Sequence, residues 1–270
     1  MSATRPAYRS DWPFYLCLGL LGGVYLLLIV AMLAADLTFT SYGHLLEALA
    51  SPEIKYAIRL SLISCTISTL LSLWVAVPLG YLLARTEFWG KEFVDTLLDI
   101  PIVLPPLVIG LSLLILFQTP PGRLFQSEVM AVTYEIPSVI LAQFSVAAAF
   151  AVRTMRVTFE QIPPRAEQVA MTLGCTRAEA FWRVVLPEAR RGLLTATTLS
   201  WARALGEFGP ILIFSGATRM RTEVLPTTVF LELSVGKIEG AVAVSLLMIV
   251  VAVVVLVITR RLGLRGTGLV

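Results

Sequence analysis

The sequence predicts an all-α integral membrane protein, with about six transmembrane helices in an N-in/C-in topology and one membrane domain over residues 1–270. The first reason is composition: 57% of the residues are hydrophobic and 14% are charged, whereas soluble domains carry about 25% charged residues. The second is that several apolar runs reach the roughly 20 residues that a helix needs to cross hydrocarbon. The third is the uneven distribution of Lys and Arg between the two sides.

Six apolar runs are separated by polar gaps, and each is predicted to be one membrane span. Their ranges are 14–35, 57–84, 97–118, 136–157, 193–215 and 241–259. The first run is more than 20 residues long, which exceeds the apolar core of about 7–15 residues in a signal peptide. We therefore expect it to stay in the protein as a membrane anchor.

Two of the runs differ from a plain apolar helix. The second carries serine and threonine throughout, and such hydroxyls in a lipid-embedded helix bond to the backbone or to a neighbouring helix. We expect it inside a helix bundle. The third contains Pro101, Pro105 and Pro106, which remove backbone donors and clash with the preceding turn. This span is predicted to be kinked or broken, with other helices covering the freed carbonyls.

The orientation follows from the basic residues in the gaps between the runs. Of the 21 Lys and Arg residues, fourteen fall on the side of the N-terminus, including Arg5 and Arg9, and six fall on the other side. The remaining one, Arg203, lies inside a span. Because cytoplasmic segments carry the excess of Lys and Arg, both termini are predicted to be cytoplasmic. The basic residues sit in gaps rather than along one face, which argues against nucleic acid as a partner.

The gap between the fourth and fifth spans, residues 153–192, has the pattern of two short helices, and we place the coupling loop that they form at 158–192. Gly174 suits a helix end that needs a left-handed residue, and Thr176 with Glu179 forms a capping-box pattern for a second helix. Pro187 is expected to end that helix. Its apolar residues recur at helical spacing and form one stripe: Ala178, Phe181, Trp182, Val185 and Leu186.

The apolar stripe of this loop allows two interpretations. An amphipathic helix with basic residues can lie on the lipid surface. Alternatively, it can dock into the groove of a partner protein.

Three sequence segments carry a resemblance to a known family. The string EQVAMTLGCTRAEAFWRVVLP, residues 167–187, resembles the EAA loop of ABC-importer permeases, with Gly174 as its glycine and Leu186-Pro187 as its closing pair. DIPIVLPPLVIGLSL at 99–113 and ALGEFGPILIFSG at 204–216 look like the third and fifth spans of molybdate and sulfate permeases. Gln168 stands where the family usually has glutamate, and the acid–Gln start is similar to that of molybdate-type permeases.

The resemblance implies a permease subunit in a bacterial or archaeal cell membrane. Its implied partners are an ABC ATPase dimer that binds ATP and Mg, a second copy of the chain, an extracytoplasmic solute-binding protein and membrane lipid. No cofactor is expected in this chain. The residues expected to couple to the ATPase are Glu167, Gln168, Ala170, Gly174, Thr176, Glu179, Phe181, Trp182, Leu186 and Pro187.

The fifth span holds charges deep in its apolar run. Arg203 and Glu207 are four residues apart, and Ser200 shares their helix face. Such charges usually face a bundle interior, a cavity or each other, so the pair is either structural or a gate on the substrate pathway. Further pathway candidates are Gly209, Pro105 and Pro106.

Other function classes lack their characteristic residues. There is no G-x-x-x-x-G-K-[ST] phosphate loop, so ATP is not used by that route in this chain. The single histidine, His44, cannot build a metal site of the usual kind, and no nucleophile–base set falls within the spans, which argues against an enzyme. An ion-gradient-driven transporter commonly shows internal repeats and several midplane acids, and neither is found. The substrate implied is an oxyanion, molybdate or tungstate, with sulfate or thiosulfate as the alternative.

Overall fold

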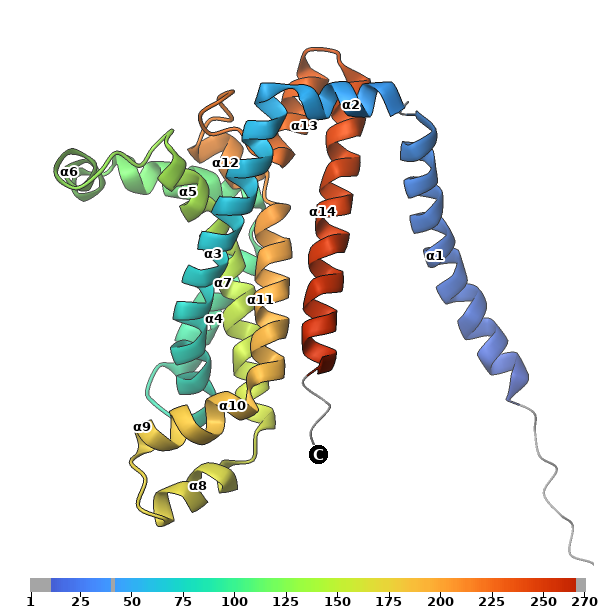
Figure 1. Ribbon diagram of the computed structural model, residues 1–270. Coiled ribbons are helices and arrows are strands. Elements are labelled where there is room, and N and C mark those ends of the chain that lie inside the picture. Colours follow the sequence, from blue (N-terminus) through green and yellow to red (C-terminus); the bar gives the residue numbers. More distant parts are fainter. Residues whose placement is uncertain (1–10, 40–41, 266–270) are drawn as a thin grey trace, which may run out of the picture.

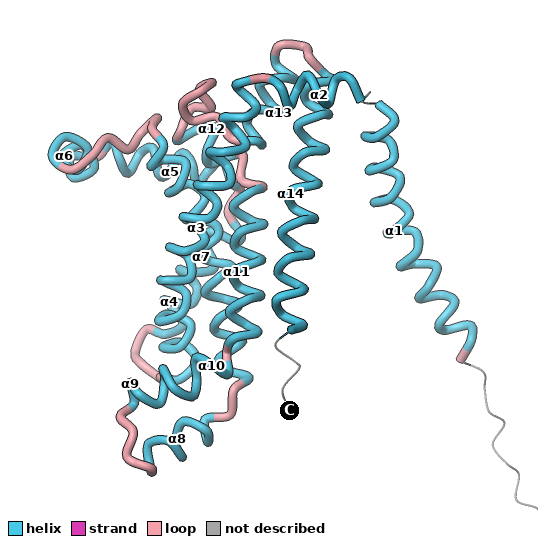
Figure 2. The backbone as a smooth tube through the Cα atoms, in the orientation of Figure 1, coloured by secondary structure: helices cyan, strands magenta, loops and turns pink. Residues whose placement is uncertain are grey.

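The computed structural model describes residues 11–39 and 42–265, and within them the regular structure is entirely helical (Figures 1 and 2). Arg5 and Arg9, which enter the prediction of orientation, lie outside the described residues, and so does the side chain of His44. The helical content agrees with the predicted fold class.

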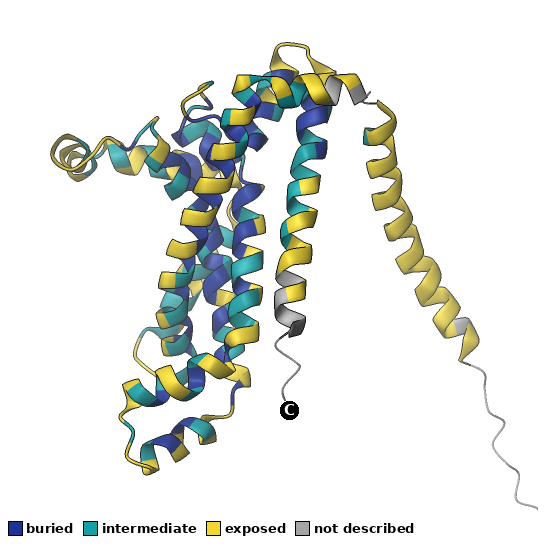
Figure 3. Ribbon diagram, viewed as in Figure 1, coloured by how far each residue is buried: buried dark blue, intermediate teal, exposed yellow. Residues whose placement is uncertain are grey.

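Four helices are long and apolar enough to cross a membrane, judged by length and composition within the described chain. They are α1 (Trp12–Phe39), α3 (Pro52–Arg85), α7 (Ile136–Gln161) and α14 (Ile238–Arg265). Helices α3 and α7 pack along each other, and α11 (Arg190–Leu205) lies against both (Figure 1). Helix α1 stands apart from this bundle, and almost its whole surface is exposed (Figure 3).

The third predicted span is sharply bent rather than straight. Helix α4 (Lys91–Val103) and helix α5 (Pro106–Gln118) meet at 113° across a short break. The break falls at Leu104 and Pro105, where consecutive prolines cannot continue the hydrogen-bond ladder. The expectation of a kinked or broken span is confirmed. Helix α5 turns away from the bundle and leads into α6 (Pro120–Glu128), which projects to the side (Figure 1).

The fifth predicted span is not one helix, and a continuous helix over 193–215 is wrong. Helix α11 ends at Leu205, and a separate short helix, α12, covers Gly209–Phe214. Gly206 caps α11. Pro210 lies in the first turn of α12, where a backbone N–H has no partner within the helix, so the missing N–H of proline costs no helical hydrogen bond. Of the six predicted spans, four are single helices long enough to cross a membrane in the described chain, and the third is a bent pair that could form one further span. The fifth is divided between the short helices α11 and α12.

The two ends of the bundle carry different short helices. One end carries α2 (Tyr42–Ala50), α12 and α13 (Leu225–Ser234) (Figure 1). The opposite end carries α8 (Pro164–Thr172), α9 (Arg177–Ala180) and α10 (Leu186–Glu188). The first turn of α1 and the last turn of α14 point toward the end with α8 to α10, as the predicted topology requires. Helix α7 extends through Gln161, so Arg153 and the first residues of the loop predicted at 158–192 lie within this helix.

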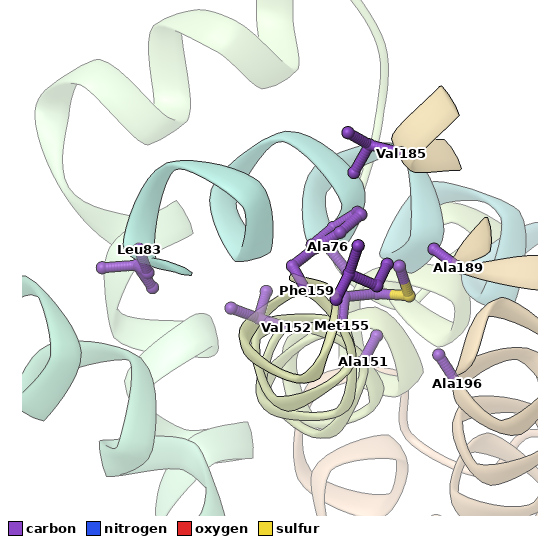
Figure 4. Packing of buried hydrophobic residues seen from close by; sticks show 10 residues of the cluster. Ala76, Leu83, Ala151, Val152, Met155, Phe159, Val185, Ala189 and Ala196 are labelled. Carbon is purple, nitrogen blue, oxygen red and sulfur yellow. The ribbon is translucent and has the colours of Figure 1, made fainter. Parts of the chain in front are cut away.

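Small residues allow α3 and α7 to pack closely in the half of the bundle near the loop. A Cβ added to Gly80 would lie 2.9 Å from the Met155 Cβ, so the two backbones nearly touch there. Ala76, Met155 and Phe159 are fully buried at this contact, and Val185 from the loop joins the same cluster (Figure 4). The loop is thus part of the hydrophobic core.

Candidate functional site

The loop at residues 162–189, called here the cytoplasmic loop, consists of two short helical segments joined by a tight turn. Helix α8 covers Pro164–Thr172, and the second segment runs through α9 (Arg177–Ala180), the π-helix η1 (Phe181–Val185) and α10 (Leu186–Glu188). Gly174 lies between them with φ of 95°, a conformation that costs glycine little. The predicted helix–turn–helix with a left-handed glycine is confirmed.

The capping box at the start of α9 is present as the sequence predicts. The backbone N–H of Glu179 donates to Thr176 Oγ1 at 3.2 Å, and the backbone N–H of Thr176 donates to Glu179 Oε2 at 2.8 Å. The hydrogen bonds from the Thr176 backbone and hydroxyl hold the pKa of Glu179 below its ordinary value. The carboxylate therefore fixes the first turn of the second segment while it is ionised.

Pro187 does not end the second segment, contrary to the prediction. A π-turn precedes it, and the backbone N–H of Leu186 donates to the carbonyl of Phe181. The wider turn accommodates the missing N–H of Pro187 and relieves its clash with the preceding turn. The chain then continues almost directly into α11, so movement of the cytoplasmic loop is connected to a helix of the membrane bundle.

The apolar stripe of the second segment is divided between two sides. The Phe181 ring lies 4.8 Å from the Tyr81 ring of α3, centroid to centroid, and Val185 is fully buried in the core between α3 and α7. Both interpretations of the stripe, lipid surface and partner groove, are therefore wrong for Phe181 and Val185, which pack against the protein's own helices. Trp182, the neighbour of Phe181, is 66% exposed.

Glu167 points into the protein. Its Oε1 accepts a hydrogen bond of 2.5 Å from the Tyr81 hydroxyl, and its Oε2 lies 3.6 Å from Arg85 Nε. Arg85 also donates through Nη2 to the carbonyl of Ile162 at 2.7 Å. Helix α8 is therefore attached to the end of α3 through a buried carboxylate, and this side chain is not presented on the outer surface of the loop.

Three apolar side chains of the cytoplasmic loop are strongly exposed and are together called here the loop patch: Val169, Leu173 and Trp182. Val169 and Leu173 are four residues apart and share one face of α8. This spacing was visible in the sequence, but the loop patch was not predicted as a unit. Of the other predicted coupling residues, Gln168 and Pro187 are exposed, Leu186 is half-buried and Ala170 is buried.

The second group of candidate residues surrounds the break between α11 and α12. Arg203 Nη2 lies 2.8 Å from Glu207 Oε1, and Glu207 is 1% exposed. The two atoms are at ion-pair distance without hydrogen-bond geometry, because Glu207 Oε1 has no hydrogen-bond partner among the described residues. The Arg203 guanidinium also lies over the Phe150 ring of α7, 5.6 Å from its centroid. Ser200 is buried and donates to the carbonyl of Ala147 at 3.4 Å.

Glycines bring α5 and α12 into direct backbone contact. A Cβ on Gly209 would lie 3.1 Å from the Pro106 Cβ, and a Cβ on Gly110 would lie 2.7 Å from the Pro210 Cα. The structure thus brings together Gly209 and Pro106, which the sequence analysis named separately. Pro105 stays exposed at the start of α5.

Ion pairs between α4 and α7 were missed at the sequence level. Arg153 Nη1 lies 2.9 Å from Asp99 Oδ2. Arg156 pairs with Asp95 of α4 and with Glu160 of its own helix. These charges lie on spanning helices, so Arg203 and Glu207 are not the only charges of that kind. The i, i+4 spacing of the two aspartates and the i, i+3 spacing of the two arginines could have indicated the pairing.

The opposite end of the bundle carries a charged network. Arg219 lies 3.4 Å from Glu223 and 2.8 Å from Glu232, measured from its guanidinium nitrogens to their carboxylate oxygens. Burial raises the pKa of Glu223 above its ordinary value, and the hydrogen bond to Glu232 raises that of Arg219. A cleft of about 730 Å³ opens beside Arg219 and Glu232, and Lys237 and Glu239 line its rim.

A comparison with protein families shows which family this chain belongs to. The model of the binding-protein-dependent transport system inner membrane component family matches residues 76–265, which hold the cytoplasmic loop, the α11–α12 break and α14. The chain belongs to this family. The protein is therefore a permease subunit, a multi-pass component of the cell membrane rather than an enzyme.

Individual relatives agree with this assignment. The permease is 36% identical to the molybdate/tungstate transport system permease protein WtpB of Pyrococcus furiosus over 209 residues, 76% of this chain and 78% of the relative. It is 30% identical to the sulfate transport system permease protein CysT of Escherichia coli over 252 residues, 90% of each chain. A solved bacterial alginate ABC transporter, in complex with an alginate-bound periplasmic protein, has a chain of the same fold. The TM-score is 0.77 with 18% identity, over 96% of both chains.

Proposed function

We propose that this permease forms the membrane pathway for a tetrahedral oxyanion, molybdate or tungstate, in an ATP-driven importer. The observation that carries the proposal is the 36% identity to a molybdate/tungstate permease. The Arg203–Glu207 pair supports it, because a guanidinium offers paired donors that match an oxyanion. Sulfate is the second candidate, since the sulfate relative aligns over 90% of each chain and sulfate is also a tetrahedral dianion.

The cytoplasmic loop is the proposed docking element for a separate ATPase, which would bind ATP and Mg. The loop patch supplies the exposed apolar surface that helix-in-groove recognition requires. Behind it, Phe181 packs on Tyr81 and Glu167 pairs with Arg85. These contacts would pass movement of the docked loop to α3, and the direct continuation into α11 would pass it to the α11–α12 break.

The permease is proposed to act as a pair of copies with an extracytoplasmic solute-binding protein on the outer end. The nearly complete exposure of α1 and the projection of α5 and α6 leave apolar surface for a second copy and for lipid. The outer charged network around Arg219 would face the solute-binding protein.

The Arg203–Glu207 pair is proposed as a gate rather than as a structural pair. Glu207→Gln would remove the negative charge that neutralises Arg203 while keeping the side-chain volume. Transport should then change by about tenfold, since the loss of a charge partner changes the free-energy difference between the open and closed gate by about 1–2 kcal/mol. The complex with the ATPase should still form. Failure of assembly in this variant would support the structural interpretation instead.

Substrate identity is tested on the solute-binding protein that works with this permease. Calorimetric titration with molybdate, tungstate and sulfate should give tight binding of the first two. Binding of sulfate alone would overturn the substrate proposal and leave the family assignment untouched.

A further inference from the structure

One face of α7 is left uncovered by its neighbours. Met155 and Phe159 face α3, Arg156 faces α4, and Thr158 lies against Gly192 at the start of α11. The remaining face, called here the open face, is formed by residues between the α4 side and the α11 side: Phe150, Arg153, Thr154 and Val157. Arg153 is 54% exposed and Val157 is 44% exposed on it.

Two arginines lie at this open face, one of its own residues and one from α11. Arg203 reaches it from α11, where its guanidinium lies over the Phe150 ring. Arg153 lies one turn further along α7 toward the cytoplasmic loop, about 4.5 Å along the helix axis. Each arginine has a carboxylate at ion-pair distance, Glu207 for Arg203 and Asp99 for Arg153. The same arrangement of guanidinium and carboxylate thus occurs twice along the axis of α7.

The Arg153–Asp99 pair contributes little to holding α4 on α7. An ion pair exposed to this extent stabilises a protein by about 0–1 kcal/mol. Arg156 is the better attachment, because it is less exposed and pairs with both Asp95 and Glu160. A charge on a spanning helix is costly unless it pairs with another charge, faces a bundle interior or faces a water-filled path. Asp99 neutralises Arg153, but the 54% exposure of the Arg153 side chain leaves it accessible from the open face.

We infer that Arg153 is a second anion-binding step on the permease pathway, on the cytoplasmic side of Arg203, with Asp99 as its displaceable counter-ion. This inference rests on the proposed oxyanion pathway. A dianion leaving Arg203 would meet Arg153 one helical turn further in and displace the Asp99 carboxylate from the guanidinium. After the anion leaves, the return of Asp99 restores the neutral pair and keeps the anion from being held.

The test uses the complete transporter, with its ATPase and solute-binding protein, reconstituted in vesicles and assayed for molybdate uptake. Arg153→Gln should lower uptake about tenfold, as loss of a charged hydrogen bond worth about 1.5 kcal/mol predicts, and Arg153→Lys should restore part of it. Asp99→Asn should retain uptake at or above the unchanged transporter, because the guanidinium stays. Equal uptake by the Arg153→Gln variant and the unchanged transporter would overturn the inference.

A second measurement separates an anion site from a structural role. Val157→Cys, in a background with Cys17, Cys65 and Cys175 replaced by serine, places a thiol one turn from Arg153 on the open face. An anionic methanethiosulfonate should label it several-fold faster than a cationic one, and Arg153→Gln should abolish that preference. Arg156→Lys is the matched control and should leave the preference intact. Equal labelling by both reagents would refute the site even if Arg153→Gln assembled poorly.

Failure of the inference is distinguishable from failure of the proposed function. If the unchanged transporter takes up no molybdate or tungstate, the proposed substrate is wrong. The thiol-labelling preference still reports whether the open face attracts anions. If uptake occurs but Arg153→Gln changes neither the uptake nor the thiol-labelling preference, the pathway proposal stands and the second anion-binding step is refuted.

Discussion

The cytoplasmic loop and the α11–α12 break are held in place by different kinds of contact. The loop is attached through long side chains, with Phe181 on Tyr81 and Glu167 on Arg85. The break is held by backbone against backbone, where Gly110 and Gly209 leave no room for a side chain. The comparison shows that side-chain packing and an ion pair hold the loop, whereas the α5–α12 crossing admits almost no added atoms.

The largest effect is expected at the attachment of the loop. Glu167→Ala should lower the free energy of unfolding by about 3 kcal/mol, because it leaves the Arg85 guanidinium buried without its carboxylate. Chemical denaturation of the purified permease in detergent measures this. The control is Glu160→Ala, where Arg156 keeps Asp95 and the cost should be about 0.5 kcal/mol or less. Equal losses in the two variants would mean that the Glu167–Arg85 contact stabilises the permease no more than the Glu160–Arg156 contact does.

The loop patch should matter for binding rather than for stability. Trp182→Ala should weaken binding of the ATPase by about 2 kcal/mol, as truncation of a central aromatic typically does, and leave the unfolding transition unchanged. Titration of the ATPase against the detergent-solubilised permease measures it. Trp74, 77% exposed on α3 and not part of the loop, is the matched control, and Trp74→Ala should bind normally. If both variants bind alike, the ATPase does not dock on the loop patch.

The helix crossing should respond to a single methyl group. Gly110→Ala should cost about 2 kcal/mol of stability, since the new Cβ would lie 2.7 Å from the Pro210 Cα and force α5 and α12 apart. The thermal midpoint in detergent reports the change. Gly206→Ala is the control, because its Cβ would find only ordinary contacts at 3.8 Å. A midpoint for Gly110→Ala as high as that of the control would show that the crossing is looser than described.

The smallest effect is expected at the cap of the second loop segment. Thr176→Ala should cost about 1 kcal/mol, the usual value of a lost N-cap. Because the folded pKa of Glu179 is lowered, its stabilisation is present above the ordinary carboxyl pKa and is lost as the pH falls through the lowered value. Unfolding measured between about pH 7 and 3 should show this acid loss in the parent and less of it in Thr176→Ala. An identical pH dependence would contradict the capping role.

Local signals in the sequence predicted the loop better than the membrane pathway. Gly174 and the Thr176–Glu179 box act between residues a few positions apart, so their roles follow from spacing alone. The inward turn of Phe181 could not be read in the same way, because an apolar stripe does not specify which side of it meets the rest of the protein. The contact of Gly209 with Pro106 joins residues about a hundred positions apart, and no local pattern encodes it.

The sequence by itself determined the class of protein, the positions of the apolar runs, the prolines that bend the third span and the cap of the loop. Each follows from hydrophobicity, backbone restriction or hydrogen bonding within a few residues. Only the tertiary structure decided that Glu167 faces Arg85 and that Arg153 lies on an open face beside Asp99. These features depend on which helices pack together, and packing is set by shape complementarity between distant segments rather than by any one segment.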